Sequence, residues 1–226
     1  MVFQVYRNMT HRTIAAMSDR SSSRFTRVVE LVLQVLTTII AAAIIGTSAH
    51  VYHAHQAGLS SQNPVWLPLW PDHFETTGNK VMIGTSSAIV FLTLLYIAIS
   101  FFPKFSHNHQ PKLSALLLVG VSTLCILLAI SSLVVSSLLE RRTGSGDTIR
   151  SWTCKFSGPA TAWSLIPSNM SSKSFRTLCT QSLFSFYAMI PVLTFQTMAL
   201  FLGVSRLMRS KQEPESPMMG DKSSVY

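Results

Sequence analysis

Four long apolar runs constrain the fold of this chain more than any other feature. They lie at residues 28–49, 81–102, 113–139 and 182–205, and the only charged side chain among them is Glu30. A helix rises about 1.5 Å per residue and needs roughly 20 residues to cross a bilayer, so each run is long enough to span. A chain of 226 residues with 12% charged residues could not cover four such helices with polar surface. The sequence therefore predicts an all-α polytopic membrane protein with four transmembrane helices in an antiparallel bundle.

The distribution of Lys and Arg predicts the orientation of the chain. With the N-terminus inside, the inner segments hold 11 of these residues and the outer loops hold 7, which together make the 18 of the whole chain. Cytosolic segments of membrane proteins carry the excess of these cations. The length of the first run fits a signal anchor better than a cleaved signal peptide. We expect both termini in the cytosol, and the protein in the plasma membrane or an endomembrane of the secretory pathway.

Two tails flank the membrane domain, which is predicted at residues 28–206. Residues 1–27 are basic and rich in serine, and we expect them to form a disordered cytosolic tail. Residues 207–226 are polar, and we expect them to be cytosolic and disordered. Ser216 precedes a proline in this second tail and is a candidate phosphorylation site.

Prolines and small residues predict how the helices pack. Pro103 and Pro111 bracket a short turn, which makes the second and third spans antiparallel neighbours, and Pro191 is expected to kink the fourth. Small residues four positions apart let helix backbones approach each other in lipid. Such pairs are Ala42 with Gly46, Gly84 with Ala88, and Ala199 with Gly203.

Polar residues in the spans are expected to bind each other. Gln34, Gln196 and the serines of the third span are positioned for hydrogen bonds between helices. Glu30 is expected to pair with Arg27 at helical spacing on its own helix. The middle of every span lacks Asp, Glu, Lys, Arg and His, which argues against a proton relay or an ion pump.

Two cysteines in the second outer loop, residues 140–181, predict a disulfide. Cys154 and Cys179 are the only cysteines outside a span, and an oxidising lumen would let them pair, although two unrelated thiols are the alternative. We expect the bond to hold Trp152 and Phe156 against the outer ends of the third and fourth spans. The same loop holds Asn169 in an Asn-Met-Ser glycosylation sequon.

The first outer loop contains the aromatic segment Trp66-Leu67-Pro68-Leu69-Trp70-Pro71. Tryptophan concentrates where bilayer meets water, because its large ring and single N–H suit both phases. A ligand pocket is the alternative, but few polar groups stand nearby. We interpret Trp66 and Trp70, with Trp152 of the second loop, as an outer-loop interface.

The sequence predicts no catalytic residue, no cofactor site and no metal site. His50, His53 and His55 follow the first span closely, but His55 does not share the helix face of the other two, and juxtamembrane polar residues explain them better than a zinc or copper site. Phosphate-binding loops and hydrolase motifs are missing from the sequence. No feature indicates a nucleic-acid partner or a small-molecule substrate.

The two outer loops carry a resemblance to known proteins. The first has the segment Trp66–Pro71, and the second has Trp152-Thr153-Cys154-Lys155 and Phe175-Arg176-Thr177-Leu178-Cys179. Over about residues 28–206 the chain resembles fungal four-span membrane proteins related to MARVEL-domain proteins. It is also similar to claudins at Trp66 and Leu69-Trp70, but its first outer loop lacks the claudin cysteines, which argues against a barrier function. The MARVEL-like resemblance implies organisation of membranes, trafficking or membrane apposition, without catalysis.

Two functional hypotheses follow. The first is a non-enzymatic tetraspan protein that organises membrane or cell-surface assemblies, or their trafficking, through its disulfide-pinned outer loop. Its partners would be the lipid bilayer, other membrane proteins or a second copy of the chain. The alternative is an auxiliary or small-solute transport subunit, which predicts a polar stripe or broken helices inside the bundle.

The predicted orientation can be tested at two sequons. Asn8-Met9-Thr10 lies in the expected cytosolic tail and Asn169-Met170-Ser171 in the expected lumenal loop. We predict that only Asn169 is glycosylated, because the transferase acts in the lumen. Gel mobility with and without an N-glycosidase, in Asn8→Gln and Asn169→Gln variants, gives the readout. A shift that depends on Asn8 would invert the orientation.

Overall fold

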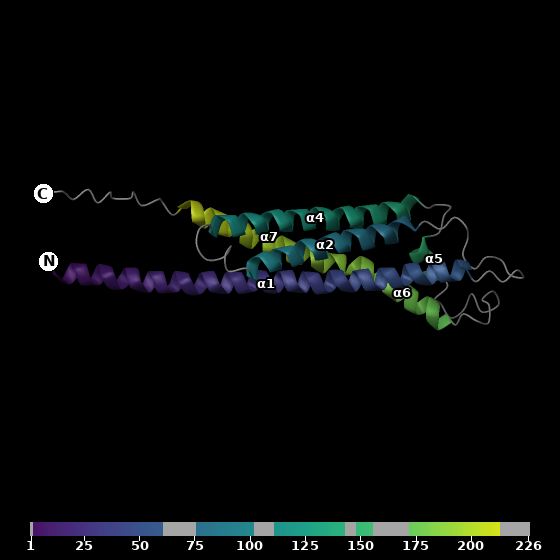
Figure 1. Ribbon diagram of the computed structural model, residues 1–226, viewed down its shortest axis with the longest axis horizontal. Helices are drawn as coiled ribbons and strands as arrows, with labels where there is room; N and C mark the ends of the chain where they lie inside the picture. The colour runs from purple at the N-terminus through teal and green to yellow at the C-terminus, as the bar shows by residue number, and fades with distance from the viewer. Residues whose placement is uncertain (1, 61–75, 102–110, 143–147, 156–171, 213–226) are drawn as a thin grey trace, which may run out of the picture.

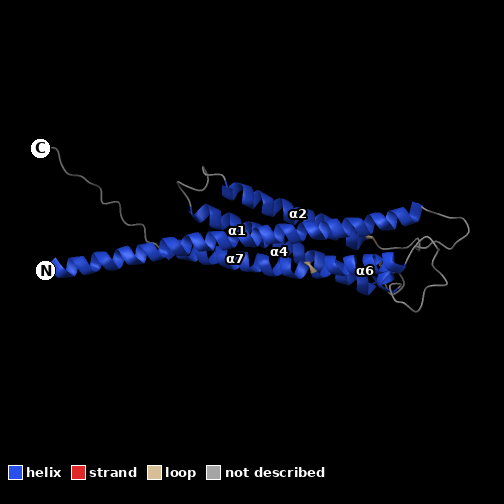
Figure 2. Ribbon diagram, turned by 90° about the horizontal axis from the view of Figure 1, so that it is seen from below, coloured by secondary structure: helices blue, strands red, loops and turns tan. Residues whose placement is uncertain are grey.

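The computed structural model describes residues 2–60, 76–101, 111–142, 148–155 and 172–212. Four long helical rods lie side by side, and the last is made of two helices that follow each other end to end (Figures 1 and 2). The helices are α1 (Val2–Ser60), α2 (Thr77–Phe101), α4 (Pro111–Arg142), α5 (Ile149–Lys155), α6 (Ser172–Tyr187) and α7 (Met189–Gln212). Both termini leave the bundle at one end, here called the terminal end (Figure 1). The opposite end, where α5 and α6 lie, is called the disulfide end.

Within the described residues, four stretches of helix are long and apolar enough to cross a membrane. They are Phe25–Gln56, Thr77–Phe101, Leu113–Arg141 and Arg176–Arg209. α1 packs against α2 and α7, and α4 also packs against α2 and α7, so each rod has two main neighbours. The predicted all-α, four-span bundle is confirmed.

Proline and glycine positions explain where the helices begin and end. α1 runs through the expected N-terminal tail, because no proline or glycine occurs before Gly46. α2 ends just before Pro103, and α4 begins with Pro111 as its first residue, where a missing N–H does no harm. α7 continues to Gln212, so helix extends into the segment expected to be disordered from residue 207. Residues 213–226 lie outside the described residues.

Buried positions repeat along every rod in alternating steps of three and four residues. This is the spacing that lets side chains of neighbouring helices interlock in a left-handed bundle. On α1 the buried residues are Glu30, Gln34, Thr37, Ala41, Ile44, Ser48, Val51 and His55. On α2 they are Met82, Ser86, Ile89, Thr93 and Tyr96, and on α4 they are Ala115, Leu118, Ser122, Cys125, Ala129 and Ser132. On α6 and α7 the series Ser182, Ser185, Met189, Val192, Gln196 and Ala199 passes through the break between the two helices.

The inside of the bundle mixes apolar and polar side chains, whereas its outer surface is largely apolar, unlike that of a soluble protein. Small and polar side chains make up much of the buried stripe, whereas large apolar side chains point outward. Phe91 is 66% exposed, Leu127 is 58% exposed and Phe201 is 72% exposed. In water such a surface would aggregate, but in lipid it is the favourable arrangement.

Polar side chains in the stripe bind each other across the helices. Gln196 Nε2 donates to Gln34 Oε1 at 3.1 Å, so both glutamines form the hydrogen bond between helices that was expected of each. Thr38 Oγ1 donates to Thr93 Oγ1 at 2.9 Å, which joins α1 to α2. These contacts satisfy part of the buried polar groups, which lipid could not bind, while Gln34 Nε2 and Gln196 Oε1 keep no hydrogen-bond partner among the described residues.

The prediction that Glu30 pairs with Arg27 is wrong. Arg206 Nη1 of α7 donates to both carboxylate oxygens of Glu30, at 3.0 and 2.7 Å. Glu30 is 1% exposed, whereas Arg27 is exposed. A buried carboxylate needs a cation at close range, and an arginine on the facing helix supplies one that Arg27 does not. The two residues are 176 positions apart in the sequence, so helical spacing gave no sign of this pair.

Only one of the three predicted small-residue pairs lies in a tight helix contact. A Cβ added at Gly203 would approach Val119 Cγ2 to 2.9 Å, so α7 and α4 pack closely there. Gly46 and Gly84 have no heavy atom within 4 Å of such a Cβ and are exposed on the bundle surface. Spacing alone did not reveal which helix face is buried.

The fourth rod is interrupted at Ala188, one turn before Pro191. Proline lacks the N–H that would bond the carbonyl of Tyr187, and its ring crowds that carbonyl. The predicted disturbance by Pro191 is therefore present as a break between α6 and α7. α7 packs on α1 and α4, whereas α6 packs chiefly on α1 and α5.

Candidate functional site at the disulfide end

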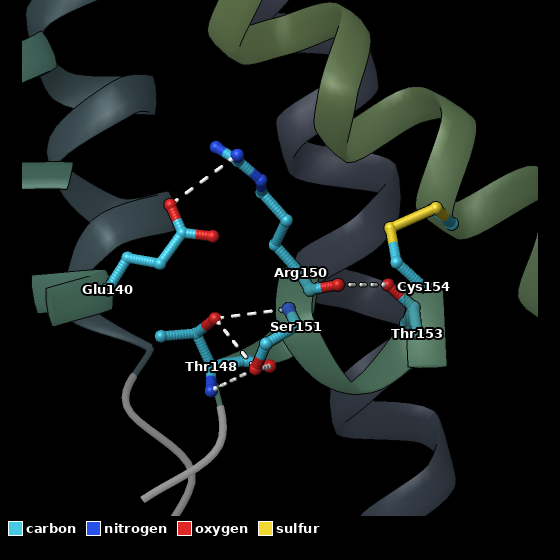
Figure 3. A network of polar contacts seen from close by, with 7 residues as sticks. Glu140, Thr148, Arg150, Ser151, Thr153 and Cys154 are labelled. Carbon is cyan, nitrogen blue, oxygen red and sulfur yellow. Dashed lines mark hydrogen bonds and ion pairs between the residues drawn. A yellow bond between two sulfur atoms is a disulfide. The ribbon is translucent and has the colours of Figure 1, made fainter. Parts of the chain in front are cut away.

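The short helix α5 begins at a hydrogen-bonded cap. The backbone N–H of Ser151 donates to Thr148 Oγ1 at 3.1 Å, and the backbone N–H of Thr148 donates to Ser151 Oγ at 3.0 Å (Figure 3). The two residues satisfy each other's backbone donors, as in a capping box. Because seven residues are too few for a helix that is stable by itself, α5 depends on its attachments.

A disulfide joins α5 to α6. Cys154 and Cys179 are bonded, with their Cα atoms 4.9 Å apart, which confirms the predicted pairing. The two cysteines are 25 positions apart. Closing a loop of that length stabilises a fold by roughly 3 to 4 kcal/mol on the chain-entropy model. Cys125, the third cysteine, is a buried free thiol in α4.

Ile149 and Thr153 are the most deeply buried residues of α5. Ile149 is 3% exposed and Thr153 is 0% exposed, and Thr153 Oγ1 donates to the carbonyl of Ile149 at 2.8 Å. Trp152, expected against the spans, is half-buried, because a residue one position from Thr153 points to another side of the helix. Phe156 lies outside the described residues.

Arg150 connects α5 to the two neighbouring rods. Its Nη2 lies 3.4 Å from Glu140 Oε2 of α4, and its guanidinium carbon lies 4.5 Å from the ring centre of Phe186 in α6. Figure 3 shows the side chain extending from α5 toward Glu140. Each contact is weak alone, in the range of about 0 to 1 kcal/mol. Together they hold the start of α5, while Cys154 holds its end.

A cavity of about 60 Å³ lies at this end of the bundle, between α2, α4, α6 and the start of α5. Its lining includes Asn79, Ser136 and Ser182 beside apolar side chains such as Met82 and Phe186. Asn79 Nδ2 and Ser136 Oγ are buried and have no hydrogen-bond partner among the described residues. The packing of α6 accounts for the cavity. α6 packs chiefly on α1 and α5, so residues 148–150 rather than α6 lie beside α4 at this end.

Several predicted site residues lie outside the described residues. Trp66 and Trp70 fall in 61–75, Asn169 falls in 156–171, and Ser216 falls in 213–226. Their roles as an outer-loop interface, a glycosylation site and a phosphorylation site stay predictions. Trp152 is therefore the one aromatic residue of the expected interface that can be placed.

The three histidines near the end of the first span have different surroundings. His50 Nδ1 is 2.8 Å from Gln181 Oε1 of α6, His53 is exposed, and His55 is 4% exposed on the buried stripe. Within the described residues, no three side chains of the kinds that bind metals gather in one place.

The fold and the site define a four-span integral membrane protein with a short helix fixed at one end of its bundle. No protein-family model, curated protein or solved structure was found to match this chain.

Sequence reasoning missed most of the cavity residues. The Thr148-x-x-Ser151 spacing is a start signal that could have revealed α5. Arg150 and Glu140 gave no such signal, because their pairing depends on where α5 docks. Asn79 and Ser136 lie on different helices, and only the assembled bundle brings them to one cavity.

The disulfide should control the order of α5 without controlling membrane insertion. We predict that Cys154→Ser and Cys179→Ser share one phenotype, retention in the endoplasmic reticulum, and that the double variant is no worse. Losing about 3 kcal/mol should free α5, whereas insertion depends on apolar length. Cell-surface labelling and imaging give the readout, with Cys125→Ser as a near-neutral control.

A thiol count tests the bond itself. One reactive cysteine in the unreduced, denatured protein is expected, namely Cys125. Three reactive cysteines would contradict the disulfide.

Proposed function

We propose that this chain is a non-enzymatic tetraspan protein that organises membrane or cell-surface assemblies, or their trafficking, by recognising other proteins at its disulfide end. In this proposal the disulfide end faces the lumen or the cell exterior, and both termini lie in the cytosol. The distribution of Lys and Arg supports that orientation. The disulfide supports it too, because such bonds persist in oxidising compartments.

The main support for the proposal is that α5 is held in place by several contacts. A helix of seven residues is held by a cap at Thr148, by Arg150 between two rods, and by the Cys154–Cys179 bond. A surface fixed before binding loses less conformational entropy when a partner docks. The resemblance to MARVEL-like proteins also favours a role in membrane organisation.

The exposed face of α6 beside the disulfide is the part of this surface best suited to a test. Arg176 and Thr180 are exposed and stand one helical turn apart, so they share a face. Cys179, which precedes Thr180 in the sequence, is buried and ties α6 to α5.

A charge reversal on this face should remove partners without disturbing the fold. We predict that Arg176→Glu combined with Thr180→Glu lowers the enrichment of neighbouring proteins in proximity labelling by about tenfold, the effect of one interface hot spot. The labelling enzyme is fused to the C-terminus of the full chain. Arg209→Glu, an equally exposed position near the terminal end, is the matched control. An unchanged neighbour list in the α6 variant, with normal surface level and thiol count, would contradict the proposal.

The alternative of a small-solute transport subunit also has support. The buried stripe contains Gln34, Thr93, Ser122 and Gln196, and the fourth rod is broken near its middle. Gln34 binds Gln196 and Thr93 binds Thr38, so these contacts use part of the polar surface that a pathway would need. Gln34 Nε2, Gln196 Oε1 and Ser122 Oγ have no hydrogen-bond partner among the described residues. A loss of solute uptake in Gln196→Leu, with the neighbour list intact, would favour transport over recognition.

A further inference from the structure

The cavity at the disulfide end contains donors that the protein itself does not use. Asn79 Nδ2 and Ser136 Oγ are both buried and have no hydrogen-bond partner among the described residues. A buried polar group without a partner is unfavourable, and native proteins rarely retain two in one place. An amide N–H and a hydroxyl carried by residues that line one cavity suit a ligand rich in acceptor oxygens.

The cavity also presents a cation and an anion side by side. Arg150 and Glu140 both line it, with 24% and 40% of their side chains exposed. Their ion pair is a single contact of 3.4 Å that uses one guanidinium nitrogen. The planar guanidinium has further N–H donors, and its fork geometry matches phosphate and carboxylate groups. A ligand with a negative group next to a positive one complements this pair.

The position of the cavity along the spans indicates that such a ligand would come from the lipid headgroups. Asn79 is two residues from the start of the span Thr77–Phe101, and Ser136 is five residues from the end of the span Leu113–Arg141. At about 1.5 Å per residue they lie roughly 3 to 8 Å inside the span ends, close to the headgroup level of the bilayer. The apolar part of the lining, including Met82, Leu139 and Phe186, suits the glycerol and the first acyl carbons.

We propose that this cavity binds the phosphate ester of a zwitterionic phospholipid from the leaflet at the disulfide end. Asn79, Ser136 and Arg150 donate to the phosphate oxygens, and Glu140 binds the headgroup ammonium. The volume of about 60 Å³ leaves room for roughly four water-sized groups, which fits a phosphate and its ester oxygens. The shared chemistry is a phosphate group, so free inorganic phosphate is the competing source.

Native mass spectrometry of the delipidated full chain in detergent tests the ligand class. We expect saturable binding of phosphatidylethanolamine, weaker binding of phosphatidylglycerol, which lacks the ammonium, and no specific binding of a diacylglycerol with the same chains. Equal binding of the diacylglycerol would overturn the proposal. Displacement of the phospholipid by inorganic phosphate alone would assign the site to a free anion instead.

Variants locate the binding in the cavity. Ser136→Ala and Arg150→Gln should each weaken phosphatidylethanolamine binding by about tenfold, the change expected from one charge-assisted hydrogen bond. Glu140→Gln should abolish the preference over phosphatidylglycerol. Arg209→Gln, an exposed arginine near the terminal end that does not line the cavity, is the matched control.

The Tm of Ser136→Ala provides a second test that does not depend on whether Arg150→Gln folds. In lipid-free protein, Ser136→Ala should not lower Tm, because it removes a buried hydroxyl that has no partner. The rise in Tm on adding phosphatidylethanolamine should shrink in the same variant. Wild-type lipid binding and a wild-type Tm shift in Ser136→Ala would contradict the site.

Discussion

The pairing of polar side chains inside the bundle is the interaction on which the rest of the structure depends. Lipid is as apolar as leucine, so apolar surface does not drive these helices together as it would in water. Tight packing and buried polar contacts must do so instead. Glu30 binds Arg206, Gln34 binds Gln196 and Thr38 binds Thr93, all in the half of the bundle nearer the terminal end. These pairs join the first span to the second and the last, and they set the register from which the disulfide end is built.

The disulfide end differs because the fourth rod changes partners where it breaks. α7 packs on α1 and α4, but beyond Ala188 the rod continues as α6 and leans on α1 and α5. α5 would not be stable alone, yet it closes this end through Cys154 and Arg150. A rigid, polar-lined end on an otherwise lipid-facing bundle is where recognition of a partner or a headgroup becomes feasible. Pro191 lies one turn after this break, and its ring and missing N–H account for it.

Much of the fold could be predicted because it depends on local properties of the sequence. Apolar length gave the four spans, and the isolation of Cys154 and Cys179 in one loop gave the disulfide. The register between helices was harder to predict from the sequence, because it depends on which face of each run is buried. These runs are apolar all round, so the buried face is marked by small and polar residues at steps of three and four, not by hydrophobicity. That pattern in Glu30, Gln34 and Thr37 was available in the sequence, but the partner Arg206 was not, since it is supplied by another helix.

The most direct test of this account is a double-mutant cycle at the Glu30–Arg206 pair, measured by equilibrium unfolding in detergent or bilayer. Glu30→Gln and Arg206→Gln should each destabilise the bundle by about 3 kcal/mol, because each leaves a charge without its partner. The double variant should lose less than the sum, with a coupling of roughly 1 to 3 kcal/mol. Arg27→Gln, on the exposed side of α1, should stay within about 0.5 kcal/mol. Additive losses, or two single variants as stable as the parent, would contradict the claim that paired polar residues set the register of this bundle.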